Sequence, residues 1–156
     1  AQRRMVDGGQ MKCADISAEE FAKYKLNKGD ILFNRTNGSA DHVGKVGLFD
    51  LDGDYCFASY LVRVTPDRTK VIPEFLVLMM SSEIFRRTAL GLAVKSAGQI
   101  NINATKMRNI TVPVPPLPEQ QRLVDKVRKL EQQIAEAQAV IASAPARKQA
   151  ILQKYL

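Results

Sequence analysis

A cluster of prolines divides this chain of 156 residues into two parts with different sequence patterns. Four prolines fall between positions 113 and 118, and proline can continue neither a helix nor a central strand. We therefore expect residues 113–118 to form an extended, stiff connector. All nine glycines come before this connector and none comes after it. The sequence thus predicts a mixed domain over residues 1–112 and a helical region over residues 118–156.

The region after the connector has the pattern of one long helix. Pro118 suits the first helical position, and the charge of Glu119 offsets the positive end of the helix dipole. Apolar residues then recur at spacings of 4, 3, 4, 3 and 4, which is the seam of a coiled coil. A helix over residues 118–142 would be about 38 Å long at 1.5 Å per residue. Pro145 is expected to break or kink it before a second, short helical piece over residues 146–156. The seam residues are Leu123, Val127, Leu130, Ile134, Ala137 and Ile141.

A narrow apolar seam has to be buried against another helix. The region before the connector offers no second helix of comparable length, so the pattern predicts a partner helix from elsewhere. The alternative is that the long helix folds back onto its own domain.

The region before the connector is predicted to mix helices and strands. Pro73 is expected to open a helix that ends near Gly91, and a short helical turn is expected just before residue 110. The turn Asp52-Gly53-Asp54 predicts that the strands on either side of it pair as a hairpin. We therefore predict an α+β fold, in which a mixed α/β domain precedes a long C-terminal coiled-coil helix. The other expected elements are a helix at 16–25 and strands at 31–33, 43–51, 55–64 and 110–114.

Motifs for catalysis are missing from the sequence. It contains no glycine-rich dinucleotide motif and no phosphate-binding Walker loop. The only histidine, His42, has no cluster of metal ligands near it in the sequence, which favours a solvated loop histidine. The segment Pro-Asp-Arg-Thr-Lys at 66–70 lacks the second carboxylate of a Mg²⁺-dependent nuclease motif, so it predicts a charged turn. We expect no catalysis by this chain alone, no metal and no cofactor.

The composition narrows the range of partners. The net charge of +7 allows a polyanionic partner without proving one. No apolar run approaches the roughly 20 residues that a membrane span needs, so no membrane partner is expected. Cys13 and Cys56 lie far apart in the sequence, which favours free thiols in a reducing cytoplasm.

Two polar segments have the residue types that bind DNA. Residues 34–39, Asn-Arg-Thr-Asn-Gly-Ser, follow a predicted strand. Arginine binds guanine and asparagine binds adenine through two hydrogen bonds each in the major groove, while serine and threonine suit phosphates. The alternative is a polar loop that caps itself through its Asn and Ser side chains. Residues 95–101 form the second segment. Further basic residues, among them Arg63 and Arg86, fit either a phosphate track or solvated surface.

In their order and spacing, these pieces resemble the specificity subunit of type I restriction–modification systems. The most telling match is the run Ile-Thr-Val-Pro-Val-Pro-Pro-Leu-Pro-Glu-Gln-Gln at 110–121, directly followed by the heptad helix. The resemblance covers nearly the whole chain. The other matching segments are 26–32 (Leu-Asn-Lys-Gly-Asp-Ile-Leu), 34–39, 43–45 (Val-Gly-Lys), 73–76 (Pro-Glu-Phe-Leu) and 98–102 (Gly-Gln-Ile-Asn-Ile).

The resemblance implies a DNA-recognition role without catalysis. In that family, a full subunit has two target-recognition domains and two conserved helices, which form an antiparallel coiled coil between the domains. Each domain reads one half of a split site on double-stranded DNA. Modification subunits, which carry the methyltransferase activity, dock on this scaffold, and a restriction subunit can join them. The resemblance implies one such domain and one helix in this chain, and we expect the segment that usually opens such a domain to be absent before Ala1. We therefore expect either a fragment or a half-subunit that pairs with itself by two-fold symmetry.

Two alternatives stay open: an assembly module that dimerises through its helix without its own DNA specificity, and the recognition portion of a single-chain restriction–methylation enzyme.

The resemblance also leads to specific residue predictions. The residues predicted to contact base edges are Asn34, Arg35, Asn37 and Gln99. The residues predicted to contact phosphates are Thr36, Ser39, Lys45, Lys95 and Ser96.

Overall fold

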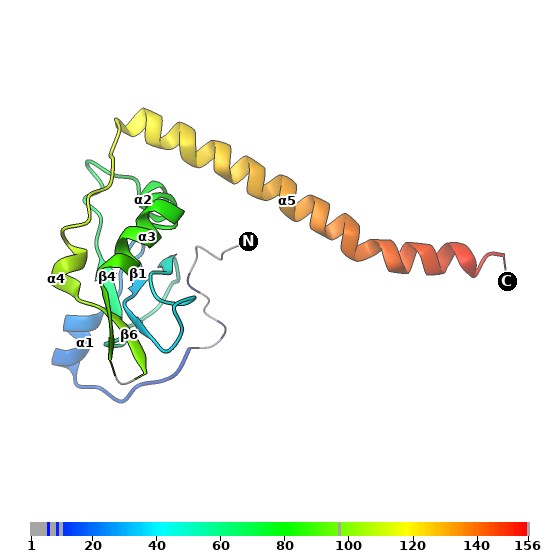
Figure 1. Ribbon diagram of the computed structural model, residues 1–156. Coiled ribbons are helices and arrows are strands. Elements are labelled where there is room, and N and C mark those ends of the chain that lie inside the picture. Colours follow the sequence, from blue (N-terminus) through cyan, green and yellow to red (C-terminus); the bar gives the residue numbers. More distant parts are fainter. Residues whose placement is uncertain (1–5, 7–8, 10, 97, 156) are drawn as a thin grey trace.

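The computed structural model describes residues 6, 9, 11–96 and 98–155, so the first five residues of the predicted domain lie outside it. A small mixed domain is followed by one long helix that runs away from it (Figure 1). The predicted α+β class is confirmed.

The core of the domain is built on a three-stranded antiparallel sheet. Strand β1 (Ile31–Asn34) lies between β3 (Val46–Leu48) and β4 (Leu61–Val64). Ile31 and Phe33 on β1 are fully buried.

The predicted hairpin across Asp52-Gly53-Asp54 is wrong. The two strands flank β1 instead of pairing with each other. The intervening segment forms a separate cluster, in which Phe49 and Tyr55 pack edge to face at 5.5 Å near Leu26. The Leu26 amide also donates to the Tyr55 carbonyl. Because the segment between β3 and β4 makes these contacts with the chain before β1, it does not form a tight hairpin turn.

A second antiparallel sheet has the order β2 (Thr36–Asn37), β6 (Gln99–Ile102) and β5 (Ala93–Ser96). Arg35 alone separates β1 from β2. Its amide donates to the Tyr60 carbonyl beside the first sheet, and its carbonyl accepts from Ile102 of the second. Strands β5 and β6 form a hairpin, and Gly98 in its turn has a positive φ of 76° that glycine tolerates.

In the described part of the domain, the two sheets are accompanied by four short helices. The predicted first helix is confirmed as α1 (Ala18–Tyr24), which a capping box between Ser17 and Glu20 opens. Pro73 opens α2 (Pro73–Met80) as predicted. The helix does not run unbroken to Gly91, because the Ser82 side chain caps a new helix, α3 (Glu83–Gly91).

The segment before the long helix also differs from prediction. The expected helical turn is α4 (Ala104–Met107), capped by the side chain of Asn103. No strand follows it at 110–114 within the described residues. Prolines occur at three of the positions 113–116 and have no amide hydrogen to donate to a strand neighbour.

The long helix, α5 (Leu117–Leu152), has 36 residues and is therefore about 54 Å long. It begins inside the predicted connector. It does not end at Pro145, which lies within the helix, so the separate piece predicted over 146–156 is wrong. The ribbon instead bends in its orange part (Figure 1), as expected for a proline kink. Alanines at 142, 144 and 146 favour helix on both sides of the proline.

Candidate nucleic-acid interface

An open polar hollow of about 670 Å³ lies where the two sheets meet. The structure brings four of the predicted contact residues to this hollow: Arg35, Thr36, Asn37 and Gln99. We call this surface the polar hollow. It is lined by Arg35, Thr36, Asn37, Gly38, Ser59, Tyr60, Gln99 and Asn101.

Strand register explains why the second sheet has a polar face. Thr36 lies opposite Asn101, and Gln99 lies opposite Ser96. Residues opposite each other point to the same face, and neighbours along a strand point to opposite faces. Thr36, Ser96, Gln99 and Asn101 therefore share one face. Ile100 and Ile102 lie on the opposite face of β6, and Ile102 is fully buried in the core.

Arg35 is held in place while part of its guanidinium group stays available. Its Nε donates to the Ser59 carbonyl at 3.1 Å. Its two terminal nitrogens make no hydrogen bond within the described part of the chain. Arginine binds guanine through two such donors, so the held side chain presents the required group without a large loss of entropy on binding.

The loop after β2 partly follows the self-capping alternative. The Asn37 Oδ1 accepts from the Ser39 amide at 3.0 Å, and the Ser39 hydroxyl accepts from the Asp41 amide at 3.1 Å. These bonds stabilise the loop and leave the Asn37 amide nitrogen beside the polar hollow.

The structure does not bring the other predicted contact residues into the polar hollow. The Asn34 Oδ1 is buried and has no hydrogen-bond partner in the described structure. Lys45 is exposed, with its Nζ 3.2 Å from the Nδ1 of His42. Lys95 and Ser96 are exposed on β5, where Ser96 lies opposite Gln99 and Lys95 lies opposite Ile100.

Two of the arginines considered for a phosphate track have structural contacts instead. Arg86 donates from Nη2 to the carbonyls of Ala40 and Asp41, at 3.1 and 2.9 Å, and so ties the loop after β2 to α3. Arg63 donates to the Lys25 carbonyl, and its guanidinium lies over the ring of Phe57 at 5.4 Å.

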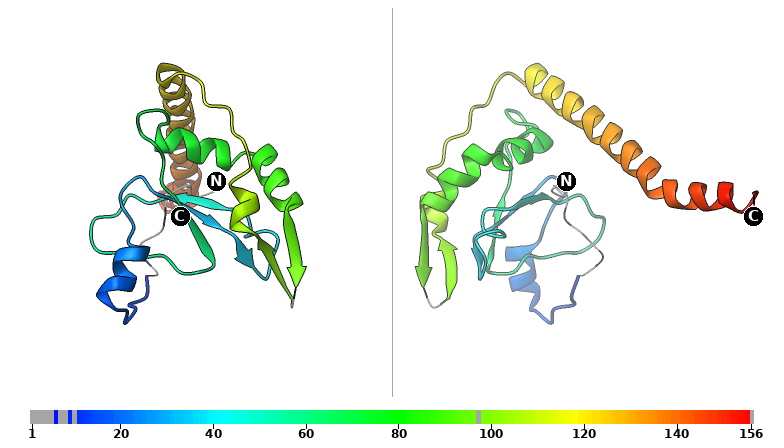
Figure 2. Two further views of the ribbon diagram at one scale, coloured as in Figure 1. Left: turned by 90° about the vertical axis from the view of Figure 1, so that its left-hand side faces the viewer. Right: turned by 45° about the vertical axis from the view of Figure 1, so that its right-hand side comes forward.

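The coiled-coil seam of α5 is uncovered in this chain. Leu123 is 39% exposed, Leu130 57%, Ile134 50% and Ile141 71%. Val127 is half-buried and Ala137 is exposed. The helix runs away from the domain (Figure 2, right), so the seam is not covered by folding back. Its pairing stays a prediction.

Within the described residues, no three His, Cys, Asp or Glu side chains lie close enough together to hold a metal ion. None of the described helices is long and apolar enough to cross a membrane. Cys13 and Cys56 are free thiols, as predicted.

Comparison with known proteins decides the family. A family model for the type I restriction modification DNA specificity domain matches residues 8–143. The chain belongs to this family. It is 32% identical over 123 residues to the StySPI specificity subunit of Salmonella potsdam, covering 78% of this chain and 27% of that protein. It is 28% identical over 127 residues to the EcoKI specificity subunit of Escherichia coli K12, covering 80% and 27% respectively.

A solved structure supports the fold of this specificity domain. The HsdS subunit from Thermoanaerobacter tengcongensis matches with a TM-score of 0.60 at 24% identity, covering 77% of this chain and 30% of that one. The chain spans about a quarter of the length of the curated relatives named above.

Four residues that line the specificity domain's polar hollow were not among the predicted contacts: Gly38, Ser59, Tyr60 and Asn101. Gly38 belonged to the polar segment at 34–39 that was considered for DNA binding. Asn101 belonged to a segment considered for DNA binding, and the alternation with Ile100 and Ile102 would have placed it beside Gln99. Ser59 and Tyr60 had no such signal, because the strand predicted over residues 55–64 begins only at Leu61. Tyr60 is 54% exposed in the turn before that strand.

Proposed function

We propose that this chain recognises one half of a split sequence on double-stranded DNA through the polar hollow. The observation that carries the proposal is the convergence of the Arg35 guanidinium with the amide side chains of Asn37, Gln99 and Asn101. Arginine reads guanine, and asparagine or glutamine reads adenine, through paired hydrogen bonds in the major groove. The net charge of +7 favours the approach to a polyanion.

Phosphate contacts would position the polar hollow on the duplex. Thr36 lies in the hollow, and Ser96 continues the same face along β5. Lys95 lies opposite Ile100, so its side chain leaves β5 on the other face, close to the hairpin turn. Ser39 and Lys45 lie in the loop between β2 and β3, and Ser39 directly follows Gly38 of the hollow in the sequence. We assign these five residues to the phosphates. Asn34 is the weakest base-contact candidate, because its Oδ1 is buried.

The proposal assigns assembly to α5 and catalysis to other subunits. The exposed seam would pair with an antiparallel helix, from a second copy or from the other half of a longer subunit. Modification subunits, which carry the methyltransferase, and a restriction subunit would dock on this scaffold in the cytoplasm. The free thiols of Cys13 and Cys56 suit a reducing compartment.

The test is a binding selection from randomised duplex DNA, with and without the modification subunit, at two salt concentrations. We expect a split site whose sequence persists at the higher salt. The variant Arg35→Ala tests the role of the polar hollow, and Arg108→Ala is its matched control. Both changes remove one positive charge, but Arg108 lies outside the polar hollow. Bound DNA without any shared sequence would contradict the proposal.

That outcome would favour the second candidate, an assembly module without DNA specificity of its own. The specific observation behind this candidate is the uncovered seam, which indicates pairing whether or not the domain binds DNA.

A further inference from the structure

The buried end of α5 contains one polar side chain in an unexpected place. Gln120 is fully buried, and burying an amide is costly unless its hydrogen bonds are made. Its Oε1 accepts from the Ile72 amide at 2.8 Å. Its Nε2 donates to the carbonyls of Lys70 at 2.9 Å and Pro115 at 2.7 Å. One side chain therefore joins the helix, the connector and the loop before α2.

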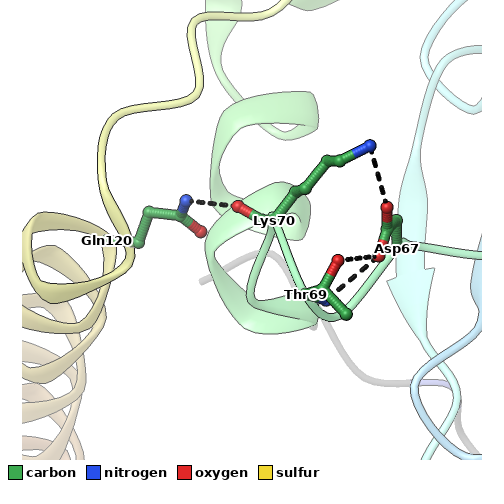
Figure 3. Close-up of polar contacts among 4 residues, drawn as sticks. All are labelled: Asp67, Thr69, Lys70 and Gln120. Atoms are coloured by element: carbon green, nitrogen blue, oxygen red, sulfur yellow. Dashed lines mark hydrogen bonds and ion pairs between the residues drawn. The ribbon is translucent and has the colours of Figure 1, made fainter.

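The loop that receives Gln120 is the charged turn singled out in the sequence. The Asp67 carboxylate accepts from the Thr69 hydroxyl at 2.6 Å and from the Thr69 amide at 3.0 Å, and it pairs with Lys70 at 3.2 Å. These contacts hold the turn that presents the Lys70 carbonyl to Gln120 (Figure 3).

Apolar packing stops soon after this point. Val124, one turn beyond Gln120, is 5% exposed and belongs to the domain core. Leu123 faces an apolar groove that Phe75 and Met79 of α2 also line. From residue 128 onward the helix is exposed in the described structure. The attachment is thus confined to the first turns of a long lever.

Because α5 is long, a small change in its angle at the attached end produces a large displacement at the far end. A rotation of about 10° at the root of a helix about 54 Å long moves the far end by about 9 Å. That displacement corresponds to roughly two to three base pairs at 3.4 Å each.

We propose that Gln120 and the Asp67–Lys70 turn form a latch that fixes the angle of α5 on the domain and thereby sets the spacing between the two half-sites. Gln120 is a positioning residue in this scheme and does not touch DNA. The inference rests on the proposed DNA recognition for its spacing readout, but not for its structural readout.

The first experiment measures binding to duplexes with fixed half-sites and a spacer varied one base pair at a time, using the full chain with its modification subunit. Gln120→Leu keeps the size of the side chain and removes its hydrogen bonds. We expect the preferred half-site sequence to stay the same, while affinities for neighbouring spacer lengths become equal to within about twofold.

The matched control is Gln121→Leu. Gln121 is exposed, and among the described residues its side chain bonds to Asp125 of the same helix and to none of the domain, so the preference for one spacer should survive. Thr69→Val is a milder variant on the other side of the latch, and it touches no atom of α5. It should broaden the spacer preference less than Gln120→Leu and in the same direction, and it serves as the test if Gln120→Leu does not fold.

The second experiment uses spin labels at positions 95 and 142, with the native cysteines changed to serine and unlabelled chain in excess. Gln120→Leu should widen the distribution of distances between the labels, and Gln121→Leu should not. An unchanged distribution together with an unchanged spacer preference in a folded variant would overturn the latch. If the wild-type chain selects no half-site but the distance distribution widens in Gln120→Leu, the proposed DNA recognition fails and the latch stands.

Discussion

The domain and the long helix treat their apolar residues in opposite ways. In the domain, Ile31, Phe33 and Ile102 are fully buried within one chain. On α5, Leu130, Ile134 and Ile141 are each at least half exposed. The domain thus satisfies its own hydrophobic residues, whereas the helix has an apolar seam that a single copy leaves uncovered. The difference teaches that the packing that stabilises the domain lies apart from the proposed pairing surface, so substitutions should affect the two separately.

The largest expected effect comes from a substitution in the buried core of the domain. Phe33 is fully buried and packs edge to face with Phe85 at 6.4 Å. Phe33→Ala should lower the free energy of unfolding by about 3–5 kcal/mol through the lost contacts and the cavity. Chemical denaturation at constant protein concentration measures the effect. Leu130→Ala on the exposed seam is the control and should change the domain transition by less than about 0.5 kcal/mol.

The next largest effect is expected from a substitution in the exposed seam of α5. If the seam pairs as proposed, Ile134→Asp places a charge in the interface and removes an apolar contact of about 1.5–3 kcal/mol. We expect association to weaken at least about tenfold, with the domain transition unchanged. Light scattering over a concentration series gives the mass of the assembly. Gln133→Asp adds the same charge beside the seam as a control, and an equal loss with both variants would argue against seam pairing.

Within the domain, the polar hollow should be separable from the core. Arg35→Ala should weaken binding by about 1–3 kcal/mol and relax selection at one base position, because the paired donors for guanine are lost. Binding to single-base variants of the selected site measures this. A uniform loss over all sequences would assign Arg35 to a phosphate instead.

The smallest effect concerns the turn that joins the two regions. Hydrogen bonds from the Thr69 hydroxyl and amide, followed by the one from Lys70, lower the pKa of Asp67 from its ordinary value of 3.8. Because the folded pKa is lowered, this stabilisation is present above about pH 3.8 and is lost as the pH falls through the folded pKa. Thr69→Val should raise the pKa of Asp67 toward 3.8. An NMR titration of the carboxyl carbon measures it, and an unchanged pKa would show that the hydroxyl is not the main cause.

Local signals predicted the elements better than their arrangement. Pro73 at the first helical position, the capping residues near Ser17 and the heptad spacing of α5 all act within a few residues, so the sequence shows them directly. The order β3-β1-β4 depends on pairing between segments that are distant in the sequence, and the segment between β3 and β4 packs into the cluster around Phe49 instead of forming a tight turn. Pro145 was expected to break or kink the helix, and it lies within α5, where the alanines around it favour continued helix.

The candidate site shows the same limit. The order of polar residues at 34–37 and at 99 was visible in the sequence, and the two segments meet because β2 pairs with β6. Tyr60 joined them only through the backbone bond between its carbonyl and the amide of Arg35. The burial of Gln120 was not predicted, because a helix seam is recognised by its apolar residues. In the sequence, a buried glutamine at the start of a helix looks the same as a solvated one.

The alternation of side chains along β6 has a consequence for evolution. Gln99 and Asn101 face the polar hollow, while Ile102 belongs to the core. Exchanging the outward residues would alter what the domain meets outside without disturbing the packing that keeps it folded. If the hollow reads DNA as proposed, single substitutions at 99 and 101 would change the sequence that is read and keep the core packing of the domain.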